Sequence, residues 1–249
     1  MSTHSHHGPL VAFTSLAIGG AGIVAAGGLM ILAGRGHEPA VSGFGAGLLF
    51  VGLLASLAHL GRWTRFPLAG TRVGRSPLST EVVLGTLALV TAVGAGVTGW
   101  FPSFAWAGLP WLSGALAAAF LVSVGLVYRL GGQLTWRGAT VLTPLTAGLA
   151  FGVSAIEGFQ RSPEVSGLAM VVLLVDAFVF RLRWRTITAL AVDGRQGELE
   201  WYERRHELLL GRFLLLDAVP FALLAVSPSL MAPLVAASGL VLDRFGFYA

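Results

Sequence analysis

The feature that most limits the fold of this chain is a series of long apolar stretches. A helix needs about 20 mainly apolar residues to cross the hydrocarbon of a bilayer, and the sequence contains eight such stretches. They cover roughly residues 9–33, 41–60, 81–101, 104–128, 139–159, 163–184, 208–227 and 229–246. Most connections between them are short. We therefore expect an all-α integral membrane protein in which residues 1–249 form a single transmembrane domain, a bundle of eight transmembrane helices.

The composition supports a membrane protein and excludes several kinds of chemistry. Only 11% of the residues are charged, whereas a soluble domain has about 25%. The chain has no cysteine, which excludes disulfides, thiol chemistry and an iron–sulfur cluster held by this chain. All sixteen positive charges are arginines scattered between apolar runs. We read them as loop charges rather than as a nucleic-acid surface, so no nucleic-acid partner is expected.

The distribution of the arginines predicts the orientation. If the connection 61–80 is cytoplasmic, so are the connections 129–138 and 185–207 and both termini. That face then holds Arg62, Arg65, Arg72, Arg75, Arg129, Arg137, Arg181, Arg183, Arg185, Arg195, Arg204, Arg205, Arg212 and Arg244. The opposite face holds only Arg35 and Arg161. Positive residues accumulate on the cytoplasmic side of membrane proteins, so fourteen against two arginines predicts cytoplasmic termini.

A candidate site lies where the second apolar stretch ends and the third begins. His59 and Glu81 flank the connection, and antiparallel helices would bring them to the same membrane surface. Quinone reduction or quinol oxidation moves two electrons and two protons. Histidine and glutamate can both donate or accept a proton at such a site. Arg62 and Arg75 could hold Glu81 ionised or orient it, whereas the alternative is that Ser79, Thr80 and Glu81 simply form a helix start.

Haem is not expected in this chain. A haem b needs axial ligands such as a pair of histidines. The six histidines are His4, His6, His7, His37, His59 and His206, and only His59 falls at the end of an apolar stretch. An intramembrane pair is therefore lacking, and no metal site is predicted.

The segment from His59 to Glu81 resembles a signature of the membrane-anchor subunit of dimethyl sulfoxide reductase. The matching residues are His59, Leu60, Gly61, Arg75, Ser76, Leu78, Ser79 and Glu81. Two further stretches are similar to that family, one with Tyr128, Arg129 and Trp136, and the other with Arg244, Phe245, Phe247 and Tyr248. Pro77 and Thr80 depart from its pattern, which usually has a tryptophan and a basic residue at these positions.

The resemblance implies an anchor without its own redox cofactor in a three-subunit molybdenum or tungsten oxidoreductase. The expected partners are a four-cluster ferredoxin-like iron–sulfur subunit, a molybdopterin catalytic subunit and membrane lipid. A menaquinone or ubiquinone would bind at the cytoplasmic side of a bacterial or archaeal inner membrane. The expected quinone-site residues are His59, Glu81, Arg62, Arg75 and Ser79. The expected docking residues are Arg65, Arg72, Arg129 and Arg137.

Charged residues inside the later apolar stretches suggest a second functional element. Asp176 and Asp217 lie well inside two stretches, with Arg181 and Arg212 one to two turns away. Charges in a membrane are costly and usually pair within a helix bundle. The alternative is that Asp176, Asp217 and Arg212 form a proton path to the quinone. Glu157 and Glu164 are expected to be solvated at the opposite surface.

Several functions remain open from the sequence. The orientation favours quinone reduction by a cytoplasm-facing dehydrogenase, similar to sulfite- or phenylacetyl-CoA-oxidising enzymes. Quinol oxidation that feeds a dimethyl sulfoxide-type reductase is the alternative direction of electron flow. A small proton-coupled transporter and a purely structural anchor are the other classes. No internal repeat is evident in the sequence, which disfavours a transporter.

Overall fold

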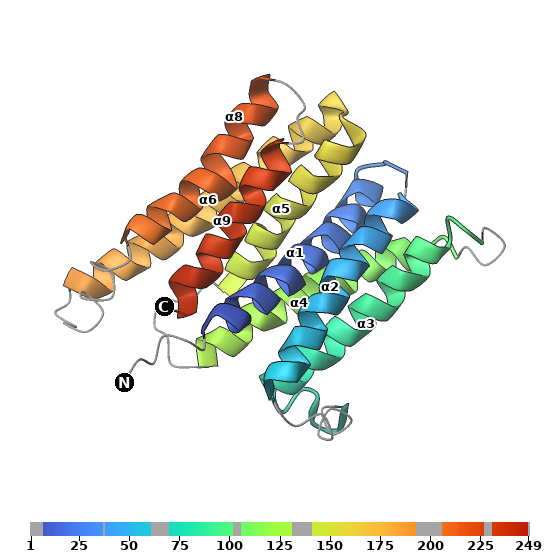
Figure 1. Ribbon diagram of the computed structural model, residues 1–249, viewed down its shortest axis with the longest axis horizontal. Helices are drawn as coiled ribbons and strands as arrows, with labels where there is room; N and C mark the ends of the chain where they lie inside the picture. The colour runs from blue at the N-terminus through green and yellow to red at the C-terminus, as the bar shows by residue number, and fades with distance from the viewer. Residues whose placement is uncertain are drawn as a thin grey trace.

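The computed structural model describes residues 7–36, 38–60, 70–101, 106–130, 141–192, 206–226 and 231–248, and these residues contain helices but no strands (Figure 1). The helices are α1 (His7–Leu32), α2 (Pro39–Leu60), α3 (Pro77–Val97), α4 (Leu109–Leu130), α5 (Thr143–Gln160), α6 (Pro163–Val192), η5 (Leu214–Ala218), α8 (Val219–Val226) and α9 (Met231–Tyr248). η5 is a π-helical turn, and with α8 it belongs to one continuous helical segment, His206–Val226, which we call segment seven. The expected all-α class is confirmed.

Six of these helices are long and apolar enough to cross a membrane. They contain the spans Val11–Leu32, Pro39–Ser56, Pro77–Val97, Leu109–Val127, Pro163–Thr186 and His206–Val226. The chain is therefore a multi-pass membrane protein. α5 and α9, each 18 residues long, are not among the six.

The helices form two groups of four with the same pattern of contacts. In Figure 1, α1 to α4 lie on one side and α5, α6, segment seven and α9 on the other, with α1 beside α5. In the first group α1 packs on α2 and α4, and α3 packs on α2 and α4. In the second group α5 packs on α6 and α9, and segment seven packs on α6 and α9. Across the groups α1 contacts α9 and α4 contacts α5. The helix arrangement thus repeats, although no repeat is evident in the sequence.

Glycines let the two groups approach closely through α1 and α5. A Cβ added to Gly22 would lie 2.0 Å from the carbonyl oxygen of Gly148, and one added to Gly152 would lie 2.2 Å from that of Gly22. Small residues allow membrane helices to gain packing contacts that lipid does not offer. Gly20 and Gly52 bring α1 equally close to α2. The glycines of α1 therefore serve tight packing against α2 and α5.

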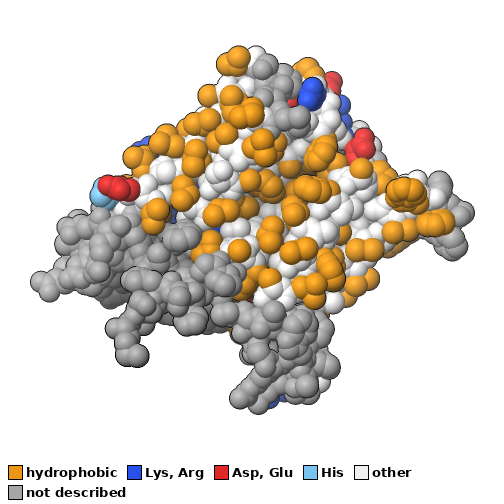
Figure 2. Space-filling model, viewed as in Figure 1, with side chains coloured by type: hydrophobic (Ala, Val, Ile, Leu, Met, Phe, Trp, Pro, Cys, Tyr) orange, Lys and Arg blue, Asp and Glu red, His pale blue; other side chains and the backbone are white. Residues whose placement is uncertain are grey.

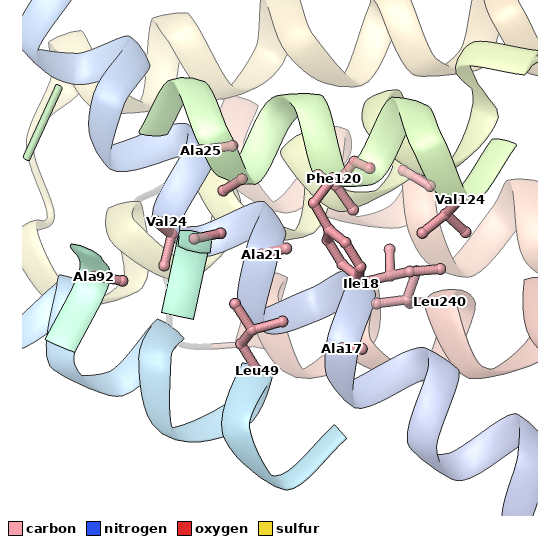
Figure 3. Close-up of a cluster of buried hydrophobic side chains, with 14 of the residues drawn as sticks. Ala17, Ile18, Ala21, Val24, Ala25, Leu49, Ala92, Phe120, Val124 and Leu240 are labelled. Atoms are coloured by element: carbon pink, nitrogen blue, oxygen red, sulfur yellow. The ribbon is translucent and has the colours of Figure 1, made fainter. Parts of the chain in front are cut away.

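The apolar core around α1 connects the two groups (Figure 3). The side chains drawn there come from α1, α2, α3, α4 and α9, and include Ala17, Ile18, Ala21, Val24, Leu49, Ala92, Phe120, Val124 and Leu240. Phe120 and Leu240 are 1% and 3% exposed, so residues of both groups share one core. On the outside, hydrophobic side chains cover much of the face in Figure 2, as expected for a surface in contact with lipid.

Several helix boundaries differ from those expected. α3 begins at Pro77 rather than at residue 81, and α4 begins at Leu109 rather than at residue 104, because a proline suits the first turn, where its missing N–H is not needed. α6 continues to Val192, so the first part of the expected connection 185–207 is helical. Residues 193–205 lie outside the described part of the chain.

We predict that Gly22→Val destabilises the protein, whereas Gly27→Val on the same helix has little effect. The new side chain at Gly22 would overlap the backbone of α5, while nothing lies within 4 Å of a Cβ at Gly27. Overpacking costs about 1–3 kcal/mol. The thermal denaturation midpoint of the purified protein in detergent measures the difference. Equal midpoints for the two variants would contradict the packing role of Gly22.

Candidate functional site

The start of α3 is held by local hydrogen bonds that bring Glu81 to its position. Ser76 is the N-cap, and its side chain accepts a hydrogen bond from the backbone N–H of Ser79 at 3.4 Å. The Thr80 hydroxyl donates to the carbonyl oxygen of Ser76 and accepts from the N–H of Gly74, each at 3.1 Å. Gly74 has a φ of 76°, which suits a glycine. The helix therefore starts one turn earlier than expected, and Glu81 lies in its second turn.

Glu81 and His59 lie on neighbouring helices at the same end of the bundle. α2 ends at Leu60 and α3 begins at Pro77, and the two helices are antiparallel and in contact. Glu81 is half-buried. It has no hydrogen bond or ion pair within the part of the chain that the structure describes. His59 belongs to the last turn of α2, but its side chain lies outside the described residues.

The other residues predicted for this end are only partly described. Ser79 is half-buried, whereas Arg72 and Arg75 are exposed in the turn before α3. Arg75 forms no ion pair with Glu81, so the interpretation that Arg75 holds this carboxylate ionised is not supported. Arg62, Arg65 and Arg137 lie outside the described residues, as does the side chain of Arg129 near the end of α4.

A buried cluster of charges occupies the second group of helices. Its centre is Arg212 of segment seven, which is 0% exposed. The two terminal nitrogens of Arg212 contact Asp176 of α6 and Asp217 of segment seven, each at 2.5 Å. The Thr146 hydroxyl of α5 donates to Asp176 at 2.6 Å. The expectation that Asp176 and Asp217 pair with an arginine inside the bundle is thus confirmed, and that arginine is Arg212.

Two further arginines complete the cluster around Asp243 of α9. Arg183 of α6 contacts Asp243 at 3.3 Å, and the adjacent Arg244 also pairs with Asp243. Nε of Arg212 lies 3.6 Å from the same carboxylate. Three arginines and three aspartates therefore meet inside the protein, and their formal charges cancel. A charge in a membrane is costly unless it is paired, and this pairing makes burial of all six groups tolerable.

The π-helical turn η5 explains how Arg212 reaches Asp217. In an α-helix, residues turn by about 100° each, so two residues five apart point about 140° away from each other. The wider π turn contains an extra residue, with the backbone N–H of Val219 bonding to the carbonyl oxygen of Leu214. Pro220 follows and has no N–H for an α-helical bond. The extra residue turns Asp217 toward the side of Arg212.

Two expectations about charged residues are wrong. Arg181 is exposed and does not pair with Asp176 or Asp217, because it points away from the side of α6 that carries Asp176 and Arg183. Glu157 was expected to be solvated but is 0% exposed in α5. Its carboxylate accepts a hydrogen bond from the Ser166 hydroxyl of α6 at 3.1 Å. Glu164 is exposed as expected and pairs with Arg35 at 2.7 Å.

The roles of Arg183, Asp243 and Arg244 in the cluster were not foreseen from the sequence. The helical spacing contained one signal, since Asp176, Phe180 and Arg183 recur every three to four residues and so share one side of α6. These three are all at most 6% exposed. Burial of Arg183, Arg212 and Arg244 also removes them from the surface charges that predict the orientation. Eleven arginines on the expected cytoplasmic face remain, against two on the opposite face, so the predicted orientation is unchanged.

No protein-family model, no curated protein and no solved structure matches this chain.

We predict that Arg212→Gln strongly destabilises the protein, whereas Arg181→Gln does not. Removing the central cation leaves Asp176 and Asp217 buried without their partner, and breaking a buried ion pair from one side costs about 3–5 kcal/mol. Arg181 is exposed on the neighbouring helix, where a substitution typically changes stability by less than about 0.5 kcal/mol. Thermal denaturation in detergent without added lipid compares the two variants.

Arg212→Lys is the informative intermediate. It keeps the positive charge but cannot contact two carboxylates with a planar fork. We expect a midpoint between those of the wild-type protein and Arg212→Gln. If the midpoint of Arg212→Lys equalled that of the wild-type protein, the simultaneous contact of the guanidinium with two carboxylates would not contribute to stability.

Proposed function

We propose that this protein is the quinone-reactive membrane anchor of a three-subunit molybdopterin oxidoreductase. It passes electrons between an iron–sulfur subunit and the membrane quinone pool. The direction that we favour is quinone reduction by a cytoplasm-facing dehydrogenase. The resemblance of the His59–Glu81 segment to the anchor subunit of dimethyl sulfoxide reductase motivates the proposal. The reverse direction, quinol oxidation, uses the same site.

The observation that best supports a proton-exchanging site is the environment of Glu81. This carboxyl group is half-buried at one end of the bundle, next to the helix end that carries His59, and it has no ion-pair partner within the described residues. Quinone chemistry needs proton donors and acceptors within hydrogen-bond reach of the two quinone oxygens. A glutamate that is not neutralised by an arginine is suited to that exchange. Ser79 lies half a turn away and adds a hydroxyl group.

The buried charge cluster is the proposed proton path. Segment seven begins, and α6 and α9 end, at the same end of the bundle as Glu81, so the cluster extends from that end toward the interior. Asp217 carries a carboxylate oxygen, Oδ1, that is buried without a hydrogen-bond partner in the described part of the chain. That oxygen could accept a proton or a water molecule. Asp176, Asp217 and Arg212 are the residues that would relay protons.

Exposed arginines at this end are the proposed contact for the iron–sulfur subunit. Arg72 and Arg75 stand in the turn that precedes α3 and are exposed. Arg129 belongs to the last turn of α4, which ends at this end of the bundle, and the sequence-based proposal adds Arg65 and Arg137, which lie outside the described residues. Electrostatic attraction to an acidic surface of that subunit would place an iron–sulfur cluster of the partner near the quinone site. No haem, iron–sulfur cluster or other metal is proposed for this chain.

We expect His59→Ala and Glu81→Gln to abolish electron exchange with a quinone analogue while the complex stays assembled. Loss of a positioned proton donor or acceptor typically lowers the rate by about 10²–10⁴-fold. The measurement is quinone turnover by the membrane-bound complex. Electron transfer to a soluble dye provides the control, because it bypasses the membrane site and should be unchanged. Normal quinone turnover in both variants would leave these residues as helix-end groups only.

We also propose that α5 and α9 cross the membrane, which gives eight spans with both termini in the cytoplasm. α5 runs beside α1 in Figure 1, and 18 residues extend about 27 Å, close to the hydrocarbon thickness of about 30 Å. Most of α5 is buried by neighbouring helices. A helix enclosed by protein can therefore be less apolar than one that faces lipid.

Cysteine labelling tests this orientation, since the chain has no cysteine of its own. Arg72→Cys should be protected from an impermeant reagent in intact cells, whereas Gly36→Cys, exposed between α1 and α2, should be labelled. Both cysteines should be labelled after the membrane is permeabilised. Labelling of Arg72→Cys in sealed cells would reverse the orientation.

A proton-coupled transporter is the second candidate, and the repeated arrangement of helices favours it. Transporters often combine structural repeats with a substrate site between them at the middle of the membrane. Here the interface between α1 and α5 is closed by the backbones of Gly22, Gly148 and Gly152. The charged side chains lie within the second group instead. The quinone-reactive anchor therefore remains the better supported function.

A further inference from the structure

An aromatic groove opens on the outer side of the second group of helices. It lies between α6 and segment seven and has a volume of about 430 Å³. Its lining includes Phe178, Phe180, Arg181, Trp184, Leu210 and Phe213. The groove is thus apolar apart from Arg181, and it lies toward the end of the bundle at which α6 ends and segment seven begins.

The aromatic floor of the groove covers the charge cluster. The ring of Phe180 stacks on Phe213, with 6.0 Å between ring centres and 15° between planes, and it is tilted against Trp184 at 6.0 Å. The guanidinium of Arg212 lies 4.6 Å from the ring centre of Phe180, within the range of a cation–π contact. Phe180 therefore separates the groove from the buried charges.

One cation, Arg181, lines the groove, and a second, Arg185, follows one helical turn later. Arg181 and Arg185 are four residues apart, on the same side of α6, and both are exposed. Neither forms an ion pair within the described residues. Trp184 lies between them in the sequence, and tryptophan is enriched where lipid headgroups meet the hydrocarbon. The pair of arginines is therefore positioned at headgroup depth.

An apolar strip continues from the groove along α6 toward the opposite surface. Phe178, Leu174 and Val171 follow one another at helical spacing and are 61%, 58% and 57% exposed. A ligand that fits both features has an anionic head and a long apolar chain. A free phosphate would use only the arginines, and a zwitterionic lipid would leave the two cations without a matching excess of negative charge.

We propose that the groove between α6 and segment seven binds one anionic phospholipid. Its phosphate contacts Arg181 and Arg185, and one acyl chain lies in the groove and along Phe178 and Leu174. Basic pockets between transmembrane helices on the cytoplasmic side are suited to such headgroups. The bound lipid would cover Phe180, the ring that separates Arg212 from the groove. This site is independent of the quinone proposal.

The test measures lipid binding to the purified full-length protein in detergent. Phosphatidylglycerol or cardiolipin is added in parallel with phosphatidylcholine and with inorganic phosphate, and both the bound lipid, by native mass spectrometry, and the thermal denaturation midpoint are recorded. We expect retention of one anionic lipid and a raised midpoint. Equal retention of phosphatidylcholine would overturn the proposed charge selectivity. An equal shift with inorganic phosphate would overturn the lipid site in favour of an anion site.

The variants separate the headgroup from the chain. Arg181→Gln combined with Arg185→Gln should weaken binding about thirtyfold, because each arginine near an anionic surface contributes about 1 kcal/mol. Ala177→Phe keeps both arginines but fills the groove, which Ala177 lines, and should also abolish retention. Arg72→Gln combined with Arg75→Gln removes two exposed charges outside the groove and should have no effect. Equal loss in this control, or undiminished binding in the other two variants, would overturn the site.

Discussion

The ion pairs of Arg212 are the interactions on which the second half of the structure depends. Arg212 joins α6 to segment seven through Asp176 and Asp217, and Asp243 brings α9 to the same cluster. Attraction between charges is strong where water is absent, but the desolvation of each charge is also costly. The four elements α5, α6, segment seven and α9 are therefore stable only in an arrangement that keeps all six charges paired.

The two halves of the molecule reach the same helix arrangement by different chemistry. The first group relies on close backbone approach, for which Gly20 and Gly52 are examples, and on an apolar core. The second group relies on the charge cluster and the π turn. Gly239 of α9 connects these two strategies, because a Cβ there would lie 2.4 Å from the backbone nitrogen of Leu216 in η5. Close packing thus also holds the π turn that positions Asp217.

Hydropathy predicted the positions of the helices because lipid requires long apolar segments. It could not find the start of α3, which depends on the cap at Ser76 and the proline that follows it. Nor could it find contacts between helices, such as Thr146 with Asp176 or Arg183 with Asp243, because these follow from rotation and packing. The juxtaposition of His59 and Glu81 at one end was predictable, since it requires only two antiparallel neighbours.

The comparison of equivalent helices supports our proposal that Glu81 takes part in quinone chemistry. α2 and α3 occupy the place in the first group that α6 and segment seven occupy in the second. In the second group the acidic residue Asp217 is compensated by Arg212 at 2.5 Å, so its charge stabilises the fold. In the first group, Glu81 has no such partner within the described residues. Glu81 can therefore change protonation without loss of an ion pair, as a group that exchanges protons directly with a quinone must, whereas the proposed relay through Asp217 uses its Oδ1 while Oδ2 stays paired with Arg212.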